Sequence, residues 1–151
     1  MKKELTSVDA MKSWASAIGA ALAGGEYIEL IGDVGAGKTT FTKGLATGLN
    51  IKEVVQSPTF TISRVYDGRD GLRLAHYDFY RLADPGIMAD ELSETLNDDK
   101  TVTVIEWGDV VSDVRPDDYL RVDIESPSET VRQVTLTAHG ERSNALLERL
   151  K

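Results

Sequence analysis

The chain has 151 residues and contains no cysteine. This absence excludes disulfide bonds, zinc sites built on thiolates and cysteine nucleophiles. Proline is scarce as well, with 4 residues, and no proline-rich linker or internal repeat divides the chain. The length fits one domain, so we expect residues 1–151 to form a single domain.

Long apolar runs are also missing. No stretch approaches the roughly 20 apolar residues that a membrane-spanning helix needs, so we expect no membrane partner. Two lysines follow Met1, but acidic and polar residues come next, so we expect no signal peptide. Together with the lack of cysteine, these features favour a cytoplasmic location.

Basic residues are outnumbered. The chain has 17 Lys and Arg against 25 Asp and Glu, for a net charge of −8. Tight binding to nucleic acid usually rests on a basic patch, so an acidic chain is a poor candidate for binding RNA alone. We expect any involvement of RNA to be indirect, through a protein partner.

Hydrophobic periodicity and turn residues predict alternating strands and helices. A first helix begins after the N-cap Ser7 and ends at Gly24 and Gly25. Strands are expected over 27–31, 59–66, 72–78 and 101–107, and helices over 38–49 and 85–96. Segments 59–66 and 72–78 would form a hairpin, and 101–107 a central strand. An antiparallel strand pair around 120–124 and 134–138 and a short helix complete an α/β fold with a mixed central sheet and flanking helices.

The strongest motif is a phosphate-binding loop. Residues 32–39 read GDVGAGKT and match G-x-x-x-x-G-K-[ST]. Its glycines let backbone N–H groups surround an anion, and the next helix directs its positive end there. Lys38 would contact the β- and γ-phosphates and Thr39 would ligate Mg²⁺. We therefore predict a P-loop NTPase fold, with ATP and Mg²⁺ as cofactors, rather than a glycine-rich turn with an accidental lysine. The expected nucleotide-binding residues are Gly32, Asp33, Val34, Gly35, Ala36, Gly37, Lys38, Thr39 and Thr40.

Acidic residues end two of the predicted strands. Glu106 follows the apolar run 102–105 and resembles a magnesium-binding Walker B residue, although it could be an ordinary strand-terminal glutamate. Asp78 could orient the attacking water or contact Mg²⁺ through a water, or could instead form a salt bridge with Arg81 or cap a helix. His76 alone is more typical of a structural histidine.

Two further segments are candidates for the same site. Thr59 follows Ser57 and Pro58, in the kind of loop that switch proteins place over a γ-phosphate. Trp107 could stack on the nucleotide, although the residues alone favour a place in the core.

Together these blocks resemble the TsaE family (formerly YjeE), the ATPase component of bacterial tRNA threonylcarbamoyladenosine biosynthesis. The matching blocks are GDVGAGKTTF at 32–41, SPTF at 57–60, HYDFYRL at 76–82 and VIEW at 104–107. The resemblance covers nearly the whole chain and is weakest over the C-terminal strand pair.

The resemblance implies a role for each matched residue. Lys38 and Thr39 would bind phosphate and Mg²⁺, and Glu106 would also ligate Mg²⁺. Thr59 would lie in a switch-like loop, Asp78 would be needed for hydrolysis, and Trp107 would lie at the nucleotide. It also implies slow ATP hydrolysis by an accessory protein that docks on the TsaB–TsaD heterodimer, which transfers the threonylcarbamoyl group to tRNA.

Three other functions compete with this interpretation. A small-molecule kinase would pass the γ-phosphate to a metabolite, and a non-catalytic module would bind ATP without turnover. A GTPase-like switch is a third, but the guanine-reading motif Asn-Lys-x-Asp is absent from the sequence, because 97–100 reads NDDK. We therefore expect a preference for adenine.

Overall fold

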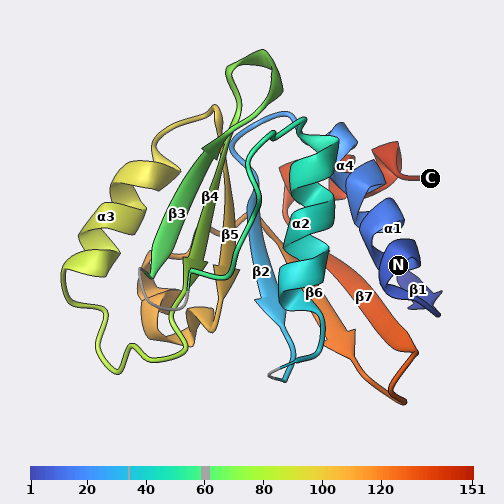
Figure 1. Ribbon diagram of the computed structural model, residues 1–151. Coiled ribbons are helices and arrows are strands. Elements are labelled where there is room, and N and C mark those ends of the chain that lie inside the picture. The colour runs from blue at the N-terminus through green and yellow to red at the C-terminus, as the bar shows by residue number, and fades with distance from the viewer. Residues whose placement is uncertain (34, 59–61) are drawn as a thin grey trace.

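The computed structural model describes residues 1–33, 35–58 and 62–151. Within them the chain forms a seven-stranded sheet in the order β1-β7-β6-β2-β5-β4-β3 (Figure 1). The strands are β1 (Lys2–Leu5), β2 (Tyr27–Ile31), β3 (Ser63–Asp67), β4 (Arg73–Asp78), β5 (Thr101–Glu106), β6 (Tyr119–Glu125) and β7 (Arg132–His139). The helices are α1 (Val8–Ala21), α2 (Lys38–Gly48), α3 (Gly86–Leu96) and α4 (Glu141–Arg149), with 3-10 turns η1 (Arg69–Gly71) and η2 (Gly108–Val114).

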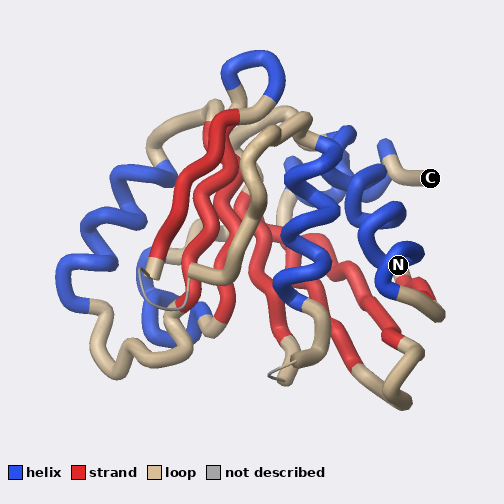
Figure 2. Tube along the Cα trace, in the orientation of Figure 1, coloured by secondary structure: helices blue, strands red, loops and turns tan. Residues whose placement is uncertain are grey.

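Four neighbouring strands in the middle of the sheet are parallel. β2 pairs with β5 on one side and β6 on the other, and β4 pairs with β5. β3, β7 and β1 add antiparallel strands toward the two edges (Figure 2). The carboxyl ends of β2, β4 and β5 therefore meet at one edge, where ligands bind in α/β sheets.

Each face of the sheet carries its own apolar core. On one face, α1, α2 and α4 contribute Ile18, Phe41 and Leu146 to the core against the sheet. On the other face, α3 and η2 contribute Leu92 and Val111. Figure 1 shows the two layers, with α3 on one side of the sheet and α1 and α2 on the other.

Helices α1 and α2 pack closely through glycine. A Cβ atom on Gly44 of α2 would lie 2.5 Å from the Cβ of Ala15 and 2.7 Å from the backbone oxygen of Lys12, both on α1. Real side chains do not approach that closely, so this position admits only glycine without a shift of one helix. The packing sets the position of α2 and therefore of its N-terminus at the glycine-rich loop.

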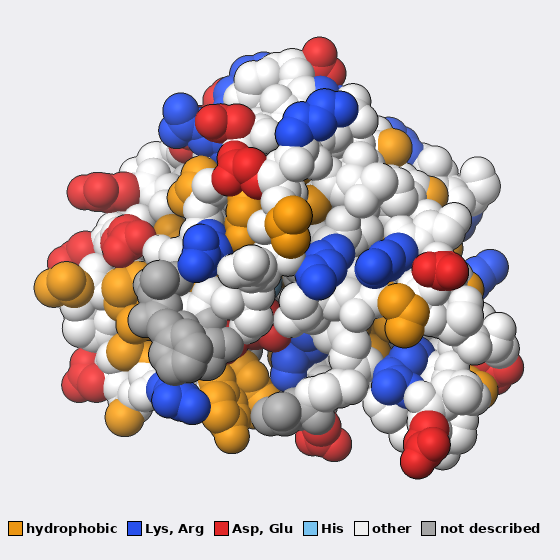
Figure 3. Space-filling model, viewed as in Figure 1, with side chains coloured by type: hydrophobic (Ala, Val, Ile, Leu, Met, Phe, Trp, Pro, Cys, Tyr) orange, Lys and Arg blue, Asp and Glu red, His pale blue; other side chains and the backbone are white. Residues whose placement is uncertain are grey.

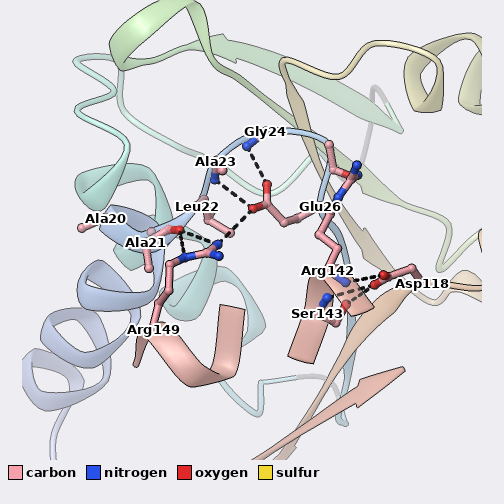
Figure 4. Close-up of polar contacts among 12 residues, drawn as sticks. Ala20, Ala21, Leu22, Ala23, Gly24, Glu26, Asp118, Arg142, Ser143 and Arg149 are labelled. Carbon is pink, nitrogen blue, oxygen red and sulfur yellow. Dashed lines mark hydrogen bonds and ion pairs between the residues drawn. The ribbon is translucent and has the colours of Figure 1, made fainter. Parts of the chain in front are cut away.

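A polar network lies at the amino ends of the parallel strands, opposite the carboxyl edge (Figure 4). Asp118, just before β6, accepts hydrogen bonds from the backbone N–H groups of Arg142 (2.6 Å) and Ser143 (3.0 Å) in the first turn of α4. Glu26 accepts hydrogen bonds from the N–H groups of Ala23 (2.8 Å) and Gly24 (2.7 Å) in the turn after α1. These buried or partly buried carboxylates hold α4 and the α1–β2 turn against the sheet, away from the carboxyl edge.

Most of the predicted elements are confirmed, with ends that shift by up to about four residues. Ser7 caps α1, its Oγ accepting from the Ala10 N–H at 3.0 Å. The predicted strand over 59–66 appears as β3, and its positions 59–61 lie outside the described residues. No helix within the described ranges is long and apolar enough to cross a membrane.

Two elements were not predicted. β1 is a four-residue edge strand in which only Leu5 is buried, so its charged sequence carries no alternation to detect. It forms because β7 offers a free edge for antiparallel pairing, which is a tertiary contact. The turn η2 also has no helical repeat in its sequence.

The close packing of α1 on α2 generates a stability prediction. We expect Gly44→Ala to lower the free energy of unfolding by about 1–2 kcal/mol, because the added methyl group overpacks the helix contact. Helix propensity alone would raise stability by about 1 kcal/mol, so the sign of the change separates the two effects. Urea unfolding followed by circular dichroism measures it. Thr47→Ala, at an exposed position of the same helix, is the control and should change stability by less than about 0.5 kcal/mol.

Candidate active site

The glycine-rich loop connects the end of β2 to the start of α2. Gly35 (φ 83°) and Gly37 (φ 113°) both adopt the left-handed conformation, which glycine takes without strain. Gly37 is the N-cap residue of α2 and has no side chain to cap the first turn. The positive end of the helix is therefore accessible to an anion. Val34 lies outside the described residues.

Lys38 is folded back over the loop that precedes it. Its Nζ donates a hydrogen bond to the backbone oxygen of Gly32 at 2.5 Å and a longer one to that of Asp33 at 3.4 Å. The same nitrogen lies 4.4 Å from the centre of the Trp107 ring, and the residue is only 7% exposed. A positive charge is thus held at the mouth of the loop.

Asp78 and Glu106 stand side by side at the carboxyl edge. They are register partners on the parallel strands β4 and β5. Glu106 is 3% exposed, and its Oε2 lies 2.6 Å from Nε2 of His76, which is completely buried. A backbone hydrogen bond also joins the two strand ends, because the N–H of Phe79 donates to the backbone oxygen of Glu106 at 3.0 Å. The sheet pairing, rather than any local turn, brings the carboxylates together.

Burial raises the pKa of the Asp78 carboxyl above its usual value. A hydrogen bond from the Tyr80 N–H to its Oδ1, 3.0 Å long, opposes this shift, and the nearby charge of Glu106 adds to it. His76 and Lys38 act weakly in the lowering direction. A carboxylate with a raised pKa accepts a proton more readily, which suits a general base.

Trp107 lies beside the glycine-rich loop, so the core position that the residues alone favoured is wrong, while its expected contact with the nucleotide stays a prediction. Its backbone is left-handed (φ 58°) and the residue is 38% exposed. Its ring centre lies 5.0 Å from that of Tyr80, which is also exposed. A bulky residue in this backbone region is strained, and such strain concentrates at functional sites.

These groups line one cavity of about 440 Å³, within the size range of small-molecule sites. Its lining residues are Gly35, Gly37, Lys38, Thr39, Thr40, Ser57, Asp78, Tyr80, Arg81, Glu106 and Trp107. Figure 3 shows that face of the molecule, with basic side chains along the α2 side and apolar side chains gathered at its lower edge.

The remaining predicted site residues either lie next to this cavity or fall outside the described residues. Gly32, Asp33 and Ala36 line a smaller hollow on the other side of the loop, toward Asp123 and Glu125 of β6. Thr59, like Val34, lies outside the described residues, although Ser57 before it reaches the main cavity.

Arg132 is a contact of the loop that the sequence did not indicate. Its Nε donates to the backbone oxygen of Ala36 at 2.9 Å, and its Nη1 donates to the oxygens of Ser128 and Val131, both at 3.0 Å. One guanidinium group therefore joins the β6–β7 turn to the glycine-rich loop. A single arginine in a segment without a motif carries no local signal, so only the folded chain reveals this role.

The Arg132 contact predicts a stiff loop. We expect Arg132→Met to raise the hydrogen-exchange rates of the amides at 35–38 by about tenfold, because a charge-assisted hydrogen bond contributes about 1.5–3 kcal/mol. Mass spectrometry of peptides that cover the loop measures the change. Arg121→Met is the control, since Arg121 pairs with Asp123 on β6. Equal exchange in both variants would show that Arg132 does not hold the loop.

The raised pKa of Asp78 predicts that replacing this residue with asparagine stabilises the protein, by an amount that depends on pH. The unfolded chain releases this proton at a lower pH than the folded chain, so stability falls as pH rises between the two pKa values. Asp78→Asn should therefore raise the unfolding midpoint at pH 7, and the gain should vanish below about pH 3, where both states are protonated.

Asp98→Asn is the control of opposite sign. The Lys100 N–H and the Thr101 hydroxyl lower the pKa of Asp98, so its replacement should reduce stability at pH 7. A loss of stability in Asp78→Asn at pH 7 would contradict the argument.

Comparisons with known proteins give the family. The model of threonylcarbamoyl adenosine biosynthesis protein TsaE matches residues 5–134. The tRNA threonylcarbamoyladenosine biosynthesis protein TsaE of Bacillus subtilis (strain 168) is 41% identical over 132 residues, which are 83% of this chain and 78% of that protein. The TsaE protein of Streptomyces coelicolor is 39% identical over 126 residues, 80% of this chain and 85% of that protein. The crystal structure of Bacillus subtilis YdiB superposes with a TM-score of 0.82 at 35% identity, over 99% of this chain and 93% of that chain. The chain therefore belongs to the TsaE family of tRNA threonylcarbamoyladenosine biosynthesis proteins.

Proposed function

We propose that this protein is a single-domain P-loop ATPase that binds Mg-ATP in the 440 Å³ cavity and hydrolyses it slowly. In this proposal it serves the tRNA modification as an accessory component docked on the TsaB–TsaD heterodimer. The observation that carries the proposal is the convergence of Lys38, Asp78 and Glu106 on one cavity from three separate elements, α2, β4 and β5.

The loop and the start of α2 would bind the phosphates. Left-handed Gly35 and Gly37 shape the backbone, and the helix end favours negative charge. Lys38 would exchange its contacts with the Gly32 and Asp33 oxygens for the β- and γ-phosphate oxygens. The described residues thus provide the positive charge that phosphoryl transfer needs.

Thr39 and Glu106 would hold Mg²⁺, which supplies charge neutralisation when bound. Among the described residues no group of three or more His, Cys, Asp or Glu side chains could hold a metal ion by itself. Mg²⁺ suits such a site, because it binds through one or two protein oxygens and completes its shell with phosphate and water. One hydroxyl and one buried carboxylate at the cavity wall fit that donor set.

Asp78 would position the attacking water. The water oxygen forms a bond to the γ-phosphorus while the bond to the bridging oxygen of ADP breaks, and the water proton passes to a carboxylate or a phosphate oxygen. The raised pKa of Asp78 favours it as the group that accepts this proton. Thr59 would complete the site next to the γ-phosphate.

The rim of the cavity would contact the rest of the nucleotide. Trp107 and Tyr80 present partly exposed rings there, and aromatic faces stack on bases. We expect adenine to be preferred, because the sequence carries no guanine-reading motif.

Family membership supports protein partners in the same pathway. With a net charge of −8 the chain is a poor RNA-binding protein by itself, so tRNA would be contacted through the TsaB–TsaD heterodimer. A role in tRNA modification also favours the cytoplasm as the location, and we expect no membrane partner.

Phosphate release from Mg-ATP tests the proposal. We expect weak hydrolysis by the protein alone and faster hydrolysis with added TsaB–TsaD. Asp78→Ala should reduce the rate by about 100-fold or more while ATP still binds, whereas Lys38→Ala should abolish binding. Asp84→Asn, in the loop beyond the cavity, is the control and should hydrolyse normally.

The alternatives give different results. ATP binding without turnover in either mixture would identify a non-catalytic module, and turnover only with a small-molecule acceptor would identify a kinase. Normal hydrolysis by the Asp78 variant would remove Asp78 from the mechanism.

A further inference from the structure

His76 is a buried polar residue that neither core packing nor the proposed mechanism accounts for. It points from β4 toward the face that carries α1 and α2, and it has no solvent exposure. Its Nδ1 has no hydrogen-bond partner among the described residues. An unpartnered buried polar atom costs about 1–3 kcal/mol, so a leucine of similar volume would serve the core better.

The sheet register places the His76 ring beside Glu106. His76 pairs with Val104 on β5, and Asp78 pairs with Glu106, so His76 and Glu106 are diagonal neighbours on one face. Their side chains meet at 2.6 Å between Nε2 and Oε2. When Glu106 is the carboxylate that binds a cation, it only accepts hydrogen bonds, so Nε2 of His76 is then the donor.

We propose that His76 is a positioning residue that fixes the Glu106 carboxylate for the cation. The inference rests on the proposed function, in which Glu106 ligates Mg²⁺. With Oε2 engaged by His76, the carboxylate is held in one orientation, and Oε1 keeps its full acceptor capacity for a cation. The hydrogen bond removes rotational freedom from a glutamate side chain before the metal binds, which reduces the entropy lost on binding.

Groups that hydrogen-bond to a metal-binding side chain affect how tightly the metal binds. Removing a hydrogen-bonding group that orients a metal-binding side chain costs about 10–100-fold in metal affinity. The charged groups that share the cavity with Glu106 include Asp78, Lys38 and Arg81. The short contact from His76 Nε2 to Oε2 therefore orients the Glu106 carboxylate from behind the cavity.

The experiment measures how Mg²⁺ strengthens binding of a fluorescent ADP analogue, with EDTA samples as the metal-free reference. In His76→Leu we expect the Mg²⁺ concentration for half-maximal effect to rise about 10–100-fold, with metal-free affinity unchanged. His76→Gln should recover much of the loss, because its amide nitrogen can reach the position of Nε2. His76→Asn is the matched control, since its shorter amide reaches only the position of Nδ1, and it should resemble the leucine variant.

Two further variants separate the possible failures. Glu106→Gln should weaken the Mg²⁺ dependence, and combining it with His76→Leu should add little, because both changes remove one interaction. If Glu106→Gln loses the dependence but the His76 variants keep it, His76 only packs and the inference is wrong while the proposed site stands. If Glu106→Gln itself retains it, Glu106 is not the metal ligand and the inference is overturned together with that role.

Folding is checked by thermal unfolding of each variant. Should His76→Leu not fold, the glutamine and asparagine variants decide the question, because both keep a polar side chain. Equal Mg²⁺ dependence in these two would overturn the donor role of Nε2.

Discussion

The parallel pairing of β2, β5 and β4 is the constraint on which the candidate active site depends. Parallel strands end at the same edge of the sheet, and their register places the end of β2 next to Glu106 and Glu106 next to Asp78. The glycine-rich loop leaves the sheet at that point and leads into α2. A slip of one residue in either pairing would turn a carboxylate to the opposite face, where α3 packs. The buried apolar strands hold the register, because β5 is buried at every position.

Two contacts from outside the phosphate-binding motif support the glycine-rich loop and the helix that follows it. Glycine at the α1–α2 contact lets α2 pack close to α1, and Arg132 from β7 donates to the Ala36 oxygen in the loop. Both contacts come from outside the phosphate-binding motif. Such contacts restrict a phosphate-binding loop built of glycine, which has the greatest conformational freedom of any residue. Preorganised N–H groups lose little entropy when an anion binds.

The cavity also contains buried charges and a strained backbone, and both cost folding free energy. Asp78 and Glu106 are neighbouring carboxylates, partly or fully buried, and Lys38 is a nearby cation. Trp107 takes a left-handed backbone conformation directly after Glu106. These features reduce stability, and the raised pKa of Asp78 is one sign of that cost. Such costs are typical of sites that are shaped for a ligand rather than for the folded state alone.

How far the sequence determines this protein depends on the range of the interactions involved. Local patterns were sufficient for the α/β class, the Ser7 cap, the hairpin of β3 and β4 and the glycine-rich loop, because each depends on neighbouring residues. The motif blocks also led to the TsaE family, which the family model and the relatives confirm. The predicted roles of Lys38, Asp78 and Glu106 in ATP hydrolysis stay predictions. Only the tertiary structure decided the edge strand β1, the exposed position of Trp107, the Arg132 contact and the pairing of His76 with Glu106. Each of these four features depends on contacts between residues that are far apart in the sequence, so no local pattern could predict it.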